Sequence, residues 1–437
     1  MSNQAVPVPG SGDEGHLDLA HPAHEAGPAE DMGARARPIP RISIQAFCEN
    51  AAMAEIVQIA SEDRRLAKAH VSVHMGGIEA AVAHYQQNPT PNLIIVESSL
   101  PRDHVIAELD RLAESCDAGT KVIVVGHVND IVLYRDLLRR GVSEYLIEPV
   151  APLQLMEAIS GLYNNPETEP VGHVYAFIGA KGGVGSSTVC HNAAWALSET
   201  LKSNVVIADL DLAFGTTGLD FNQDPVQGIA DALSSPERLD EVLLDRLLTK
   251  CSEHLSIFAA PVVLDRDYDI SVAGCDQVID VVRQNVPYVV VDLPHTWTSW
   301  TKSVLFQADE VIITAAPDLA NLRNAKNIID LLQNARRNDS RPRLVMNMVN
   351  MPKRPEISVK EFESALDLKV MSVIEFDAET FGQAANNGQM IEELSSRAKS
   401  AAAFHDIALA MTHRRDIQQG KKTSALAPLL EKLKIRL

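Results

Sequence analysis

A glycine-rich loop with hydroxyl side chains beside it is the strongest sign of chemistry in this sequence. The apolar run 174–178 is followed by Gly179-Ala-Lys-Gly-Gly-Val-Gly-Ser-Ser-Thr188 and then by a helical pattern. A strand, a glycine-rich turn and a helix in this order form a cradle for phosphate, because backbone N–H groups converge there and the helix N-terminus adds its positive end. The loop predicts a nucleotide phosphate site, with a purely structural turn as the alternative.

The loop departs from the standard phosphate-loop pattern at one position. Gly185 and Ser187 match the end of the pattern G-x-x-x-x-G-K followed by Ser or Thr, with Gly179 one position before the pattern's first glycine, but Ser186 stands where that pattern has lysine. Ser187 takes the next position, whose hydroxyl would hold Mg²⁺. Because serine carries no charge, the loss of a charged phosphate contact costs about 2–4 kcal/mol in the transition state, and we expect hydrolysis to be slow or absent. The candidate nucleotide-binding residues of the loop are Gly182, Gly183, Val184, Gly185, Ser186, Ser187 and Thr188.

Three aspartates stand at the ends of apolar runs that are typical of buried strands. Asp209 and Asp211 follow the run VVIA, and Asp292 follows the run YVVV. Ligands of open parallel sheets bind at the carboxyl ends of the strands. Each aspartate alone is more often a cap or a turn residue, but three of them beside a phosphate loop can hold Mg²⁺ and position water. Ser187, Asp209 and Asp292 are the candidate metal ligands.

The elements that must position these residues alternate between strand and helix patterns in two separate stretches. We predict an α/β protein with two doubly wound parallel-sheet domains. The first domain covers 41–163 and the second covers 173–437. The strands predicted for the first domain are 41–48, 69–75, 92–98, 121–127 and 143–150. The strands predicted for the second domain are 173–179, 204–210, 287–292, 310–315 and 343–349.

Two further stretches lack the apolar periodicity of folded elements. Residues 1–40 are rich in Pro, Gly, Ala, His and acid, so they cannot bury enough surface to order themselves and are predicted to be disordered. Residues 164–172 carry two prolines and two acids and are predicted to be a linker.

Composition excludes several classes of protein. Lysine and arginine total 39 and aspartate and glutamate total 58, so the formal charge is −19, which argues against bulk binding to nucleic acid. Hydrophobic residues make up 46% of the chain, and no apolar run approaches the roughly 18–20 residues of a membrane-spanning helix. The chain does not start with a secretory signal pattern. Its five scattered cysteines indicate no disulfide framework, so a reducing cytoplasm is expected.

The order and spacing of these motifs resemble the deviant-Walker family of dimeric ATPases that includes MinD and ParA, over about 173–395. The resemblance implies ATP and Mg²⁺ as cofactors. It also implies that Lys181 reaches across an ATP-dependent homodimer to the partner's nucleotide, and that Asp211 is the catalytic aspartate. Asp292 matches the Walker B position of the family.

Two later segments carry the same resemblance. Asn347 matches an asparagine that contacts the adenine, and residues 375–391 match a segment near the nucleotide. The family has a second lysine at the position of Ser186, which bridges the β- and γ-phosphates. The chain departs from its family at this point, although Lys181 of a partner subunit would restore part of the missing charge.

The first domain resembles a response-regulator receiver in its strand order and length. Glu97 stands at the phosphoacceptor position, and Glu49 is a remnant of the acids after the first strand. Gly126 replaces the hydroxyl residue, and Glu148 replaces the lysine. Because glutamate does not form the usual aspartyl phosphate, we interpret this domain as a degenerate receiver used for docking. An unrelated flavodoxin-like domain is the alternative.

A degenerate receiver joined to a MinD/ParA-like domain with an altered lysine resembles the CpaE/TadZ family, over about 41–437. The family assembles and localises the tight-adherence (Flp-type, type IVb) pilus. The resemblance implies a nucleotide-binding homodimer with weak or no hydrolysis, at the cell pole or at the inner face of the membrane. The implied partners are the ATPase and inner-membrane components of the pilus secretion machinery, or a polar marker protein.

Two other functions stay open. One is an active MinD-like ATPase that cycles for spatial positioning. The other is a DNA-partition ATPase, against which the acidic body argues, since no nucleic acid partner is expected for such a charge.

Two further features have a structural and a functional interpretation. Trp297 and Trp300, after the Walker B strand, form either a dimer or partner surface or part of the core. The tail from Thr412 carries seven basic and two acidic residues, with leucines at helical spacing. It is either a weak contact for anionic lipid, as in MinD, or a packed or frayed end.

Overall fold

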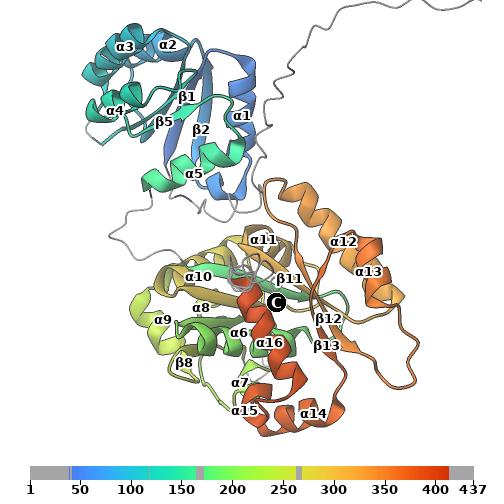
Figure 1. The fold of residues 1–437 in the computed structure, drawn as a ribbon. Coiled ribbons are helices and arrows are strands. Elements are labelled where there is room, and N and C mark those ends of the chain that lie inside the picture. The colour runs from blue at the N-terminus through green and yellow to red at the C-terminus, as the bar shows by residue number, and fades with distance from the viewer. Residues whose placement is uncertain (1–38, 40–41, 118, 164–171, 262–267, 413–437) are drawn as a thin grey trace, which may run out of the picture.

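A computed structural model describes residue 39 and residues 42–117, 119–163, 172–261 and 268–412 (Figure 1). The segment predicted to be disordered, the predicted linker and the basic tail lie almost wholly outside the described residues. The start of the first predicted domain and the end of the second fall there too, and the predicted domain limits stay predictions. Below, the front domain means residues 42–163 and the second domain means residues 172–412.

The front domain is a five-stranded parallel sheet with helices on both faces (Figure 1). The strand order is β2-β1-β3-β4-β5, so the chain winds first to one side of β1 and then to the other. The strands are β1 (Ser43–Cys48), β2 (His70–Met75), β3 (Leu93–Ser98), β4 (Lys121–Gly126) and β5 (Glu144–Ile147). The helices are α1 (Ala51–Ser61), the short 3₁₀ helix η1 (Arg64–Leu66), α2 (Gly77–Tyr85), α3 (Arg102–Ser115), α4 (Ile131–Arg139) and α5 (Pro152–Tyr163).

The second domain is an eight-stranded sheet of order β13-β12-β11-β6-β10-β7-β9-β8, parallel except for the pairing of β8 with β9. The loop-bearing strand β6 lies between β11 and β10, near the middle of the sheet. The strands are β6 (His173–Gly179), β7 (Val205–Asp209), β8 (Thr249–Lys250), β9 (Leu255–Phe258), β10 (Tyr288–Asp292), β11 (Glu310–Ala315), β12 (Arg343–Val349) and β13 (Val370–Glu375).

Helices cover both faces of this second sheet as well. The helices are α6 (Ser186–Leu201), α7 (Thr217–Asp220), α8 (Ile229–Ser234), η2 (Pro236–Arg238), α9 (Glu241–Leu247), α10 (Val272–Asn285), α11 (Ser299–Gln307), α12 (Leu319–Ala335), α13 (Val359–Leu366), α14 (Ala378–Asn387), α15 (Ile391–Leu394) and α16 (Lys399–Met411). Alternate residues of β6 belong to two different hydrophobic cores, as the two-residue period of a strand requires. One core lies under α8 to α13, and the other lies under α6, α14, α15 and α16.

The doubly wound fold predicted from the sequence is confirmed, and all ten predicted strands are present. Three further strands at the sheet edges were not predicted. β8 and β9 are only two and four residues long. Most of β13 is not fully buried, so its sequence lacks the continuous apolar run that marks central strands.

Charged side chains connect the two domains at the amino-terminal edge of the second sheet. Arg64 of η1 donates from Nε to Asp339 at 2.8 Å and from its terminal nitrogen to Asp309 at 3.2 Å. Asp339 also accepts a hydrogen bond from Arg336 Nε at 2.7 Å, and Asp309 accepts one from Arg283 at 2.9 Å. These side chains are nearly buried, so each carboxylate is held by arginines instead of water.

These contacts of Arg64 with Asp309 and Asp339 are called the seam below, and we expect Asp339→Asn to weaken them. Burial alone would raise the pKa of Asp339, but Arg64, Arg336 and Arg65 lower it to about 2. Losing the carboxylate removes charged hydrogen bonds, so the free energy of unfolding should fall by about 1–3 kcal/mol in urea denaturation at pH 7.

The seam also predicts a pH dependence. The lowered pKa of Asp339 means that its contribution to stability is complete above 3.8 and is lost as the pH falls through about 2. The difference between the wild type and Asp339→Asn should therefore shrink over that range. Asp330→Asn is the control, because Asp330 forms a half-exposed pair with Lys326, and it should change stability by less than about 0.5 kcal/mol. An equal effect of the two substitutions would contradict the prediction.

Candidate nucleotide site

The glycine-rich loop joins the buried strand β6 to helix α6, as the sequence predicts. Helix α6 begins at Ser186, and Gly185 caps it in the left-handed conformation with φ 78°. Gly183 has the same φ of 78°. A side chain at Gly185 would also place its Cβ 2.7 Å from Asn347 Nδ2, so glycine is required there for two reasons. The sequence therefore folds into a tight turn that leaves the N–H groups of the first helical turn open.

Side chains from three later segments hold the loop in place. His295 Nδ1 donates to the carbonyl of Gly179 at 3.0 Å, and Asn324 Nδ2 donates to Ala180 at 2.9 Å. Asn347 Nδ2 donates to the carbonyl of Val184 at 2.9 Å. Because both ends of the loop are fixed, its N–H groups are preorganised for an anion.

The two positions that distinguish this loop differ in exposure. The side chain of Lys181 is 52% exposed, and its amino group lies 4.0 Å from Asp318. Its amino group therefore lies at the surface of the domain. The hydroxyl of Ser186 is buried and has no hydrogen-bond partner among the described residues. An orphaned hydroxyl at the start of a phosphate loop fits a phosphate oxygen as its acceptor.

The aspartates predicted to form a metal site meet at the carboxyl edge of the sheet. Asp209 and Asp292 are register partners at the ends of β7 and β10, and both are essentially fully buried. Asp209 accepts hydrogen bonds from the N–H of Asp211 at 3.0 Å and from Thr217 Oγ1 at 2.6 Å. Asp211 itself is half-buried and accepts from the N–H of Phe214 at 3.1 Å. The turn after β7 is thus closed by carboxylate-to-backbone hydrogen bonds.

Asp292 has the environment of a cation ligand. Both of its carboxylate oxygens are buried without a hydrogen-bond partner among the described residues. Burial and the charge of Asp292 raise the pKa of neighbouring Asp209 to about 7. Two adjacent buried carboxylates attract positive charge, which Mg²⁺ would supply in addition to the neighbouring His191. The donor set fits Mg²⁺, which Asp292 and the hydroxyl of Ser187 would hold.

His191 is a functional residue of this cluster that the sequence analysis missed. Its side chain is fully buried on α6, with Nδ1 2.7 Å from Asp220 and Nε2 3.0 Å from Thr217 Oγ1. Nε2 is also 3.5 Å from Asp292. Burial alone lowers the pKa of His191, but Asp220 and Asp292 raise it to about 10, so the imidazole is charged at neutral pH. Its place one helical turn beyond Ser187 is the signal that could have identified it.

The other predicted residues take clear positions around the loop. Both ends of the Asn347 side-chain amide are engaged: Nδ2 donates to the loop, and Oδ1 accepts from the N–H of Met348 at 2.9 Å. The segment 375–391 forms α14, and the N–H of Ile391 bonds Asn192 of α6 at 2.8 Å. Asn347 therefore contacts the loop and the segment contacts the helix after it, while contact with adenine stays a prediction for Asn347.

Trp297 and Trp300, for which the sequence left core packing and a dimer or partner surface open, differ in the structure. Trp300 is 8% exposed and packs in the core through α11. Trp297 precedes that helix and is 52% exposed. Core packing therefore describes Trp300, and a role of Trp297 in a dimer or partner surface stays a prediction.

The corresponding edge of the front domain has no room for a receiver's hydroxyl. A Cβ at Gly126 would lie 2.5 Å from Tyr145 Oη, which donates to the carbonyl of Val128 at 2.9 Å. The buried Glu97 accepts from the N–H groups of Glu49 at 2.6 Å and Asn50 at 3.2 Å. These contacts explain the glycine at 126, because the tyrosine fills the space of a side chain there.

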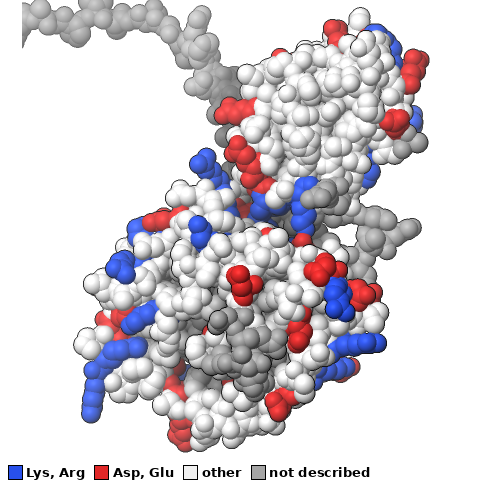
Figure 2. All heavy atoms as spheres, turned by 180° about the vertical axis from the view of Figure 1, so that it is seen from behind, with Lys and Arg blue, Asp and Glu red and all other residues white. Residues whose placement is uncertain are grey.

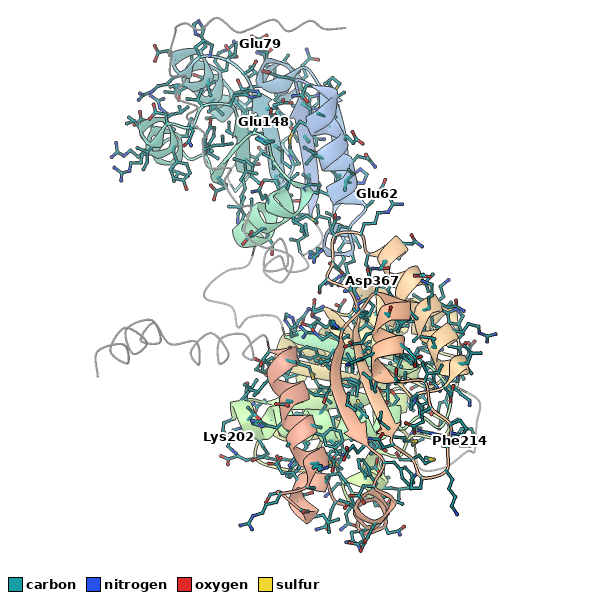
Figure 3. All side chains as sticks on the ribbon, turned by 45° about the vertical axis from the view of Figure 1, so that its right-hand side comes forward. Glu62, Glu79, Glu148, Lys202, Phe214 and Asp367 are labelled. Atoms are coloured by element: carbon teal, nitrogen blue, oxygen red, sulfur yellow. The ribbon has the colours of Figure 1, made fainter. Side chains whose placement is uncertain are left out.

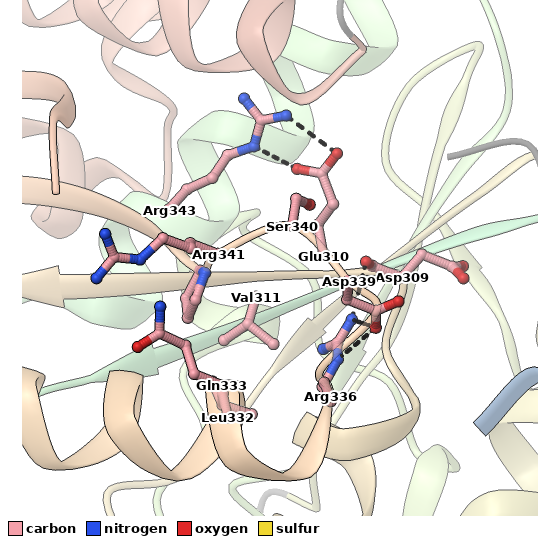
Figure 4. Close-up of a pocket in the computed structure, with 11 residues that line it drawn as sticks. Asp309, Glu310, Val311, Leu332, Gln333, Arg336, Asp339, Ser340, Arg341 and Arg343 are labelled. Carbon is pink, nitrogen blue, oxygen red and sulfur yellow. Dashed lines mark hydrogen bonds and ion pairs between the residues drawn. The ribbon is translucent and has the colours of Figure 1, made fainter. Parts of the chain in front are cut away.

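A cavity at the opposite edge of the second sheet does not offer a ligand site (Figure 4). Its charged lining is paired internally, Arg343 with Glu310 and Arg336 with Asp339, so it has no excess charge to recognise a ligand. Among the described residues, no helix combines the length and the apolar character needed to cross a bilayer.

Comparison with known proteins relates the chain to two groups. A family model described as an AAA domain matches residues 172–346. The septum site-determining protein MinD of Bacillus subtilis is 25% identical over 252 residues, which are 54% of this chain and 88% of MinD. The crystal structure of the pilus assembly protein CpaE from Caulobacter crescentus is 50% identical over 30% of this chain and 98% of that chain, with a TM-score of 0.29. A ParA family ATPase from Chlorobium tepidum shares the fold, with 24% identity, a TM-score of 0.51 and coverage of 55% of this chain and 98% of that chain.

Proposed function

The chain belongs to the CpaE family of pilus assembly proteins, and we propose that it is a nucleotide-dependent assembly factor of a type IVb (Flp/Tad) pilus secretion system. In this proposal the second domain binds ATP with Mg²⁺ and dimerises on it, and hydrolysis is slow or absent. The front domain docks on a component of the secretion machinery or on a polar marker. The protein acts as a spatial scaffold more than as a turnover enzyme.

The observation that carries this proposal is a complete phosphate cradle that lacks one charge. The loop backbone supports binding of a phosphate and a cation, as do the hydroxyl of Ser186 and the carboxylate of Asp292, neither of which has a hydrogen-bond partner among the described residues. Serine at 186 offers no positive charge to the γ-phosphate. ATP supplies the phosphates, and Mg²⁺ neutralises them when bound. Asp211 would orient water at the strand end, where its backbone hydrogen bonds fix its position.

The test is ATP affinity and phosphate release, measured on the full-length chain with and without Mg²⁺. Saturable binding with little phosphate release supports the scaffold. Steady phosphate release that Asp211→Ala abolishes would favour the cycling ATPase instead. Failure to bind ATP at millimolar concentration would overturn the proposal and leave localisation to protein contacts alone.

A DNA-partition ATPase is disfavoured by charge. Figure 2 shows lysine and arginine interspersed with aspartate and glutamate over the face in view, where a DNA-binding surface would show a continuous basic stripe. Titration of duplex DNA at low salt is the check, and tight binding there would favour partition.

Lys181→Ala should abolish dimer formation in the presence of ATP. The exposed side chain of Lys181 approaches Asp318 at 4.0 Å within its own protomer. Its amino group is therefore available to the phosphates of a nucleotide bound by a partner subunit. Sedimentation velocity with and without ATP measures the shift from monomer to dimer. We expect the variant to stay monomeric at ATP concentrations that dimerise the wild type.

The matched control is Lys326→Ala. Lys326 is 56% exposed on α12 and pairs with Asp330, so its replacement removes one surface charge without touching the loop. It should dimerise like the wild type. ATP-dependent dimers of Lys181→Ala at wild-type affinity would remove the proposed role in trans.

A further inference from the structure

Three side chains that commonly bind metals meet at the carboxyl edge of the front sheet, far from the nucleotide loop in sequence. Glu97, His127 and Glu148 each offer one ligand atom, and these atoms lie within 4.8 Å of one another. Glu97 belongs to β3, His127 follows β4, and Glu148 follows β5. Figure 3 shows Glu148 within the front domain.

The pleat of the strands explains why these side chains face one another. Residues two apart in a strand project from the same face. On each of four strands, a residue of the same hydrophobic core or packed against it is followed two positions later by one of the polar residues of this edge. The pairs are Ala46 and Cys48, Ile95 and Glu97, Val125 and His127, and Leu146 and Glu148. The four polar groups therefore continue the face of that core to its open end.

The charge of the cluster calls for a cation. Glu97 is 1% exposed, and its carboxylate accepts from the N–H groups of Glu49 and Asn50 and from the side-chain amide of Asn50, while it lies beside Glu148. His127 pairs with Glu148 at 3.2 Å from Nδ1, but an imidazole carries a full charge only when it is protonated. Two carboxylates and an imidazole whose donor atoms lie within 4.8 Å of one another form a ligand set that a divalent cation would hold together.

The buried thiol of Cys48 is an independent feature of the same edge. Its side chain is 1% exposed, and no hydrogen bond of its thiol is recorded within the described parts of the chain. Cys48 follows Phe47, whose register partner on β3 is Val96, so Cys48 lies beside Glu97 in the sheet. An ion held by the three donors would therefore have this thiol as a neighbour.

We propose that Glu97, His127 and Glu148 bind a divalent first-row transition metal ion, with Zn²⁺ as the probe, and that Cys48 adjoins the ion. Mg²⁺ takes oxygen ligands, whereas an imidazole and a nearby thiol select zinc-like ions. Glu49 is not one of the three residues whose donor atoms meet there, and its carboxylate accepts from the N–H of Ser99 at 3.0 Å. The ion would join β3, β4 and β5 at the edge where the domain is open.

The test is Zn²⁺ affinity of the full-length chain, measured by competition with a chromophoric chelator. His16, His21 and His24 are replaced by alanine in every sample, so that the amino-terminal histidines do not bind the probe. His127→Ala and Glu148→Gln should each weaken one Zn²⁺ site by at least about tenfold. His104→Ala is the control, because His104 is an exposed histidine of the same domain, and it should leave the affinity unchanged.

Cobalt provides a second measurement that a merely structural role would not change. Co²⁺ in the site should give intense visible absorption, which both variants lose. Cys48→Ser should remove any near-ultraviolet thiolate band. Zn²⁺ affinity that survives both His127→Ala and Glu148→Gln, or the absence of a site that these variants weaken, would overturn the proposal. His127 is 43% exposed, so metal-free His127→Ala should unfold like the wild type and the comparison stays valid.

Discussion

Replacing Ser186 by lysine should raise ATP turnover by about 30-fold to 10³-fold, because it restores a charged group worth about 2–4 kcal/mol to the transition state. Ser186 is the first residue of α6, and its orphaned hydroxyl lies at the base of the loop. A lysine there starts from the same backbone position and reaches the β- and γ-phosphates as a point charge. Phosphate release under saturating ATP and Mg²⁺ measures the effect.

The control for this gain is Ser186→Met. Methionine matches the length of a lysine side chain but carries no charge, so it tests whether filling space alone changes turnover. We expect Ser186→Met to stay at the wild-type rate or below it. Turnover of Ser186→Lys that rises by less than about threefold would show that the missing charge does not limit hydrolysis, since a factor of that size is under 1 kcal/mol.

Replacing His191 by leucine should lower the free energy of unfolding by about 3–5 kcal/mol, the usual cost of removing one partner from a buried charge cluster. The imidazolium of His191 faces Asp220 and Asp292 directly and contacts Thr217, which in turn donates to Asp209. Without it, the carboxylates remain buried and uncompensated. Chemical denaturation of the metal-free protein at pH 7 measures the loss.

The dependence on pH separates charge from packing. The folded pKa of His191 is about 10 and its ordinary value is 6.5, so its contribution is complete below 6.5 and is lost as the pH rises through about 10. The gap in stability between the wild type and His191→Leu should narrow over that range. His405→Leu is the control, because His405 is an exposed histidine of α16, and it should cost less than about 0.5 kcal/mol. A gap that does not vary with pH would mean that the imidazole acts by packing alone.

Continuous apolar runs made the central strands predictable, because strands buried on both faces need them. The phosphate loop and the aspartates at the strand ends followed from the same logic, since strand ends fix where side chains meet. The edge strand β13 escaped because its residues are mostly half-exposed. Local pattern therefore identified every strand of the front sheet, but in the second sheet it identified the middle better than the edges.

Contacts between distant segments were beyond prediction from one sequence. His191 looked like a helical residue among alanines, and only the fold places it between Asp220 and Asp292. Arg64 and Asp339 are 275 positions apart, so no local pattern connects them. At Gly126 the sequence showed that a hydroxyl is missing, whereas the structure shows that Tyr145 fills the space.

The position of the seam determines what a dimer would look like from outside. Arg64 attaches the front domain at the amino-terminal edge of the second sheet, whereas the nucleotide loop lies at the carboxyl-terminal edge (Figure 1). Phe214, in the turn after β7, is 75% exposed on the loop side (Figure 3). Two copies joined through their nucleotide faces would carry their front domains at opposite outer ends.

Such a dimer would present two docking domains that face away from each other. A partner present as a single copy would bind one front domain, but an array of partners would bind both. Binding two sites at once raises overall affinity by about 10²–10⁴-fold without any new contact. Because ATP would pair the chains, it would also raise their affinity for clustered partners above their affinity for isolated ones. ATP binding would then make the protein sensitive to the local density of its partner.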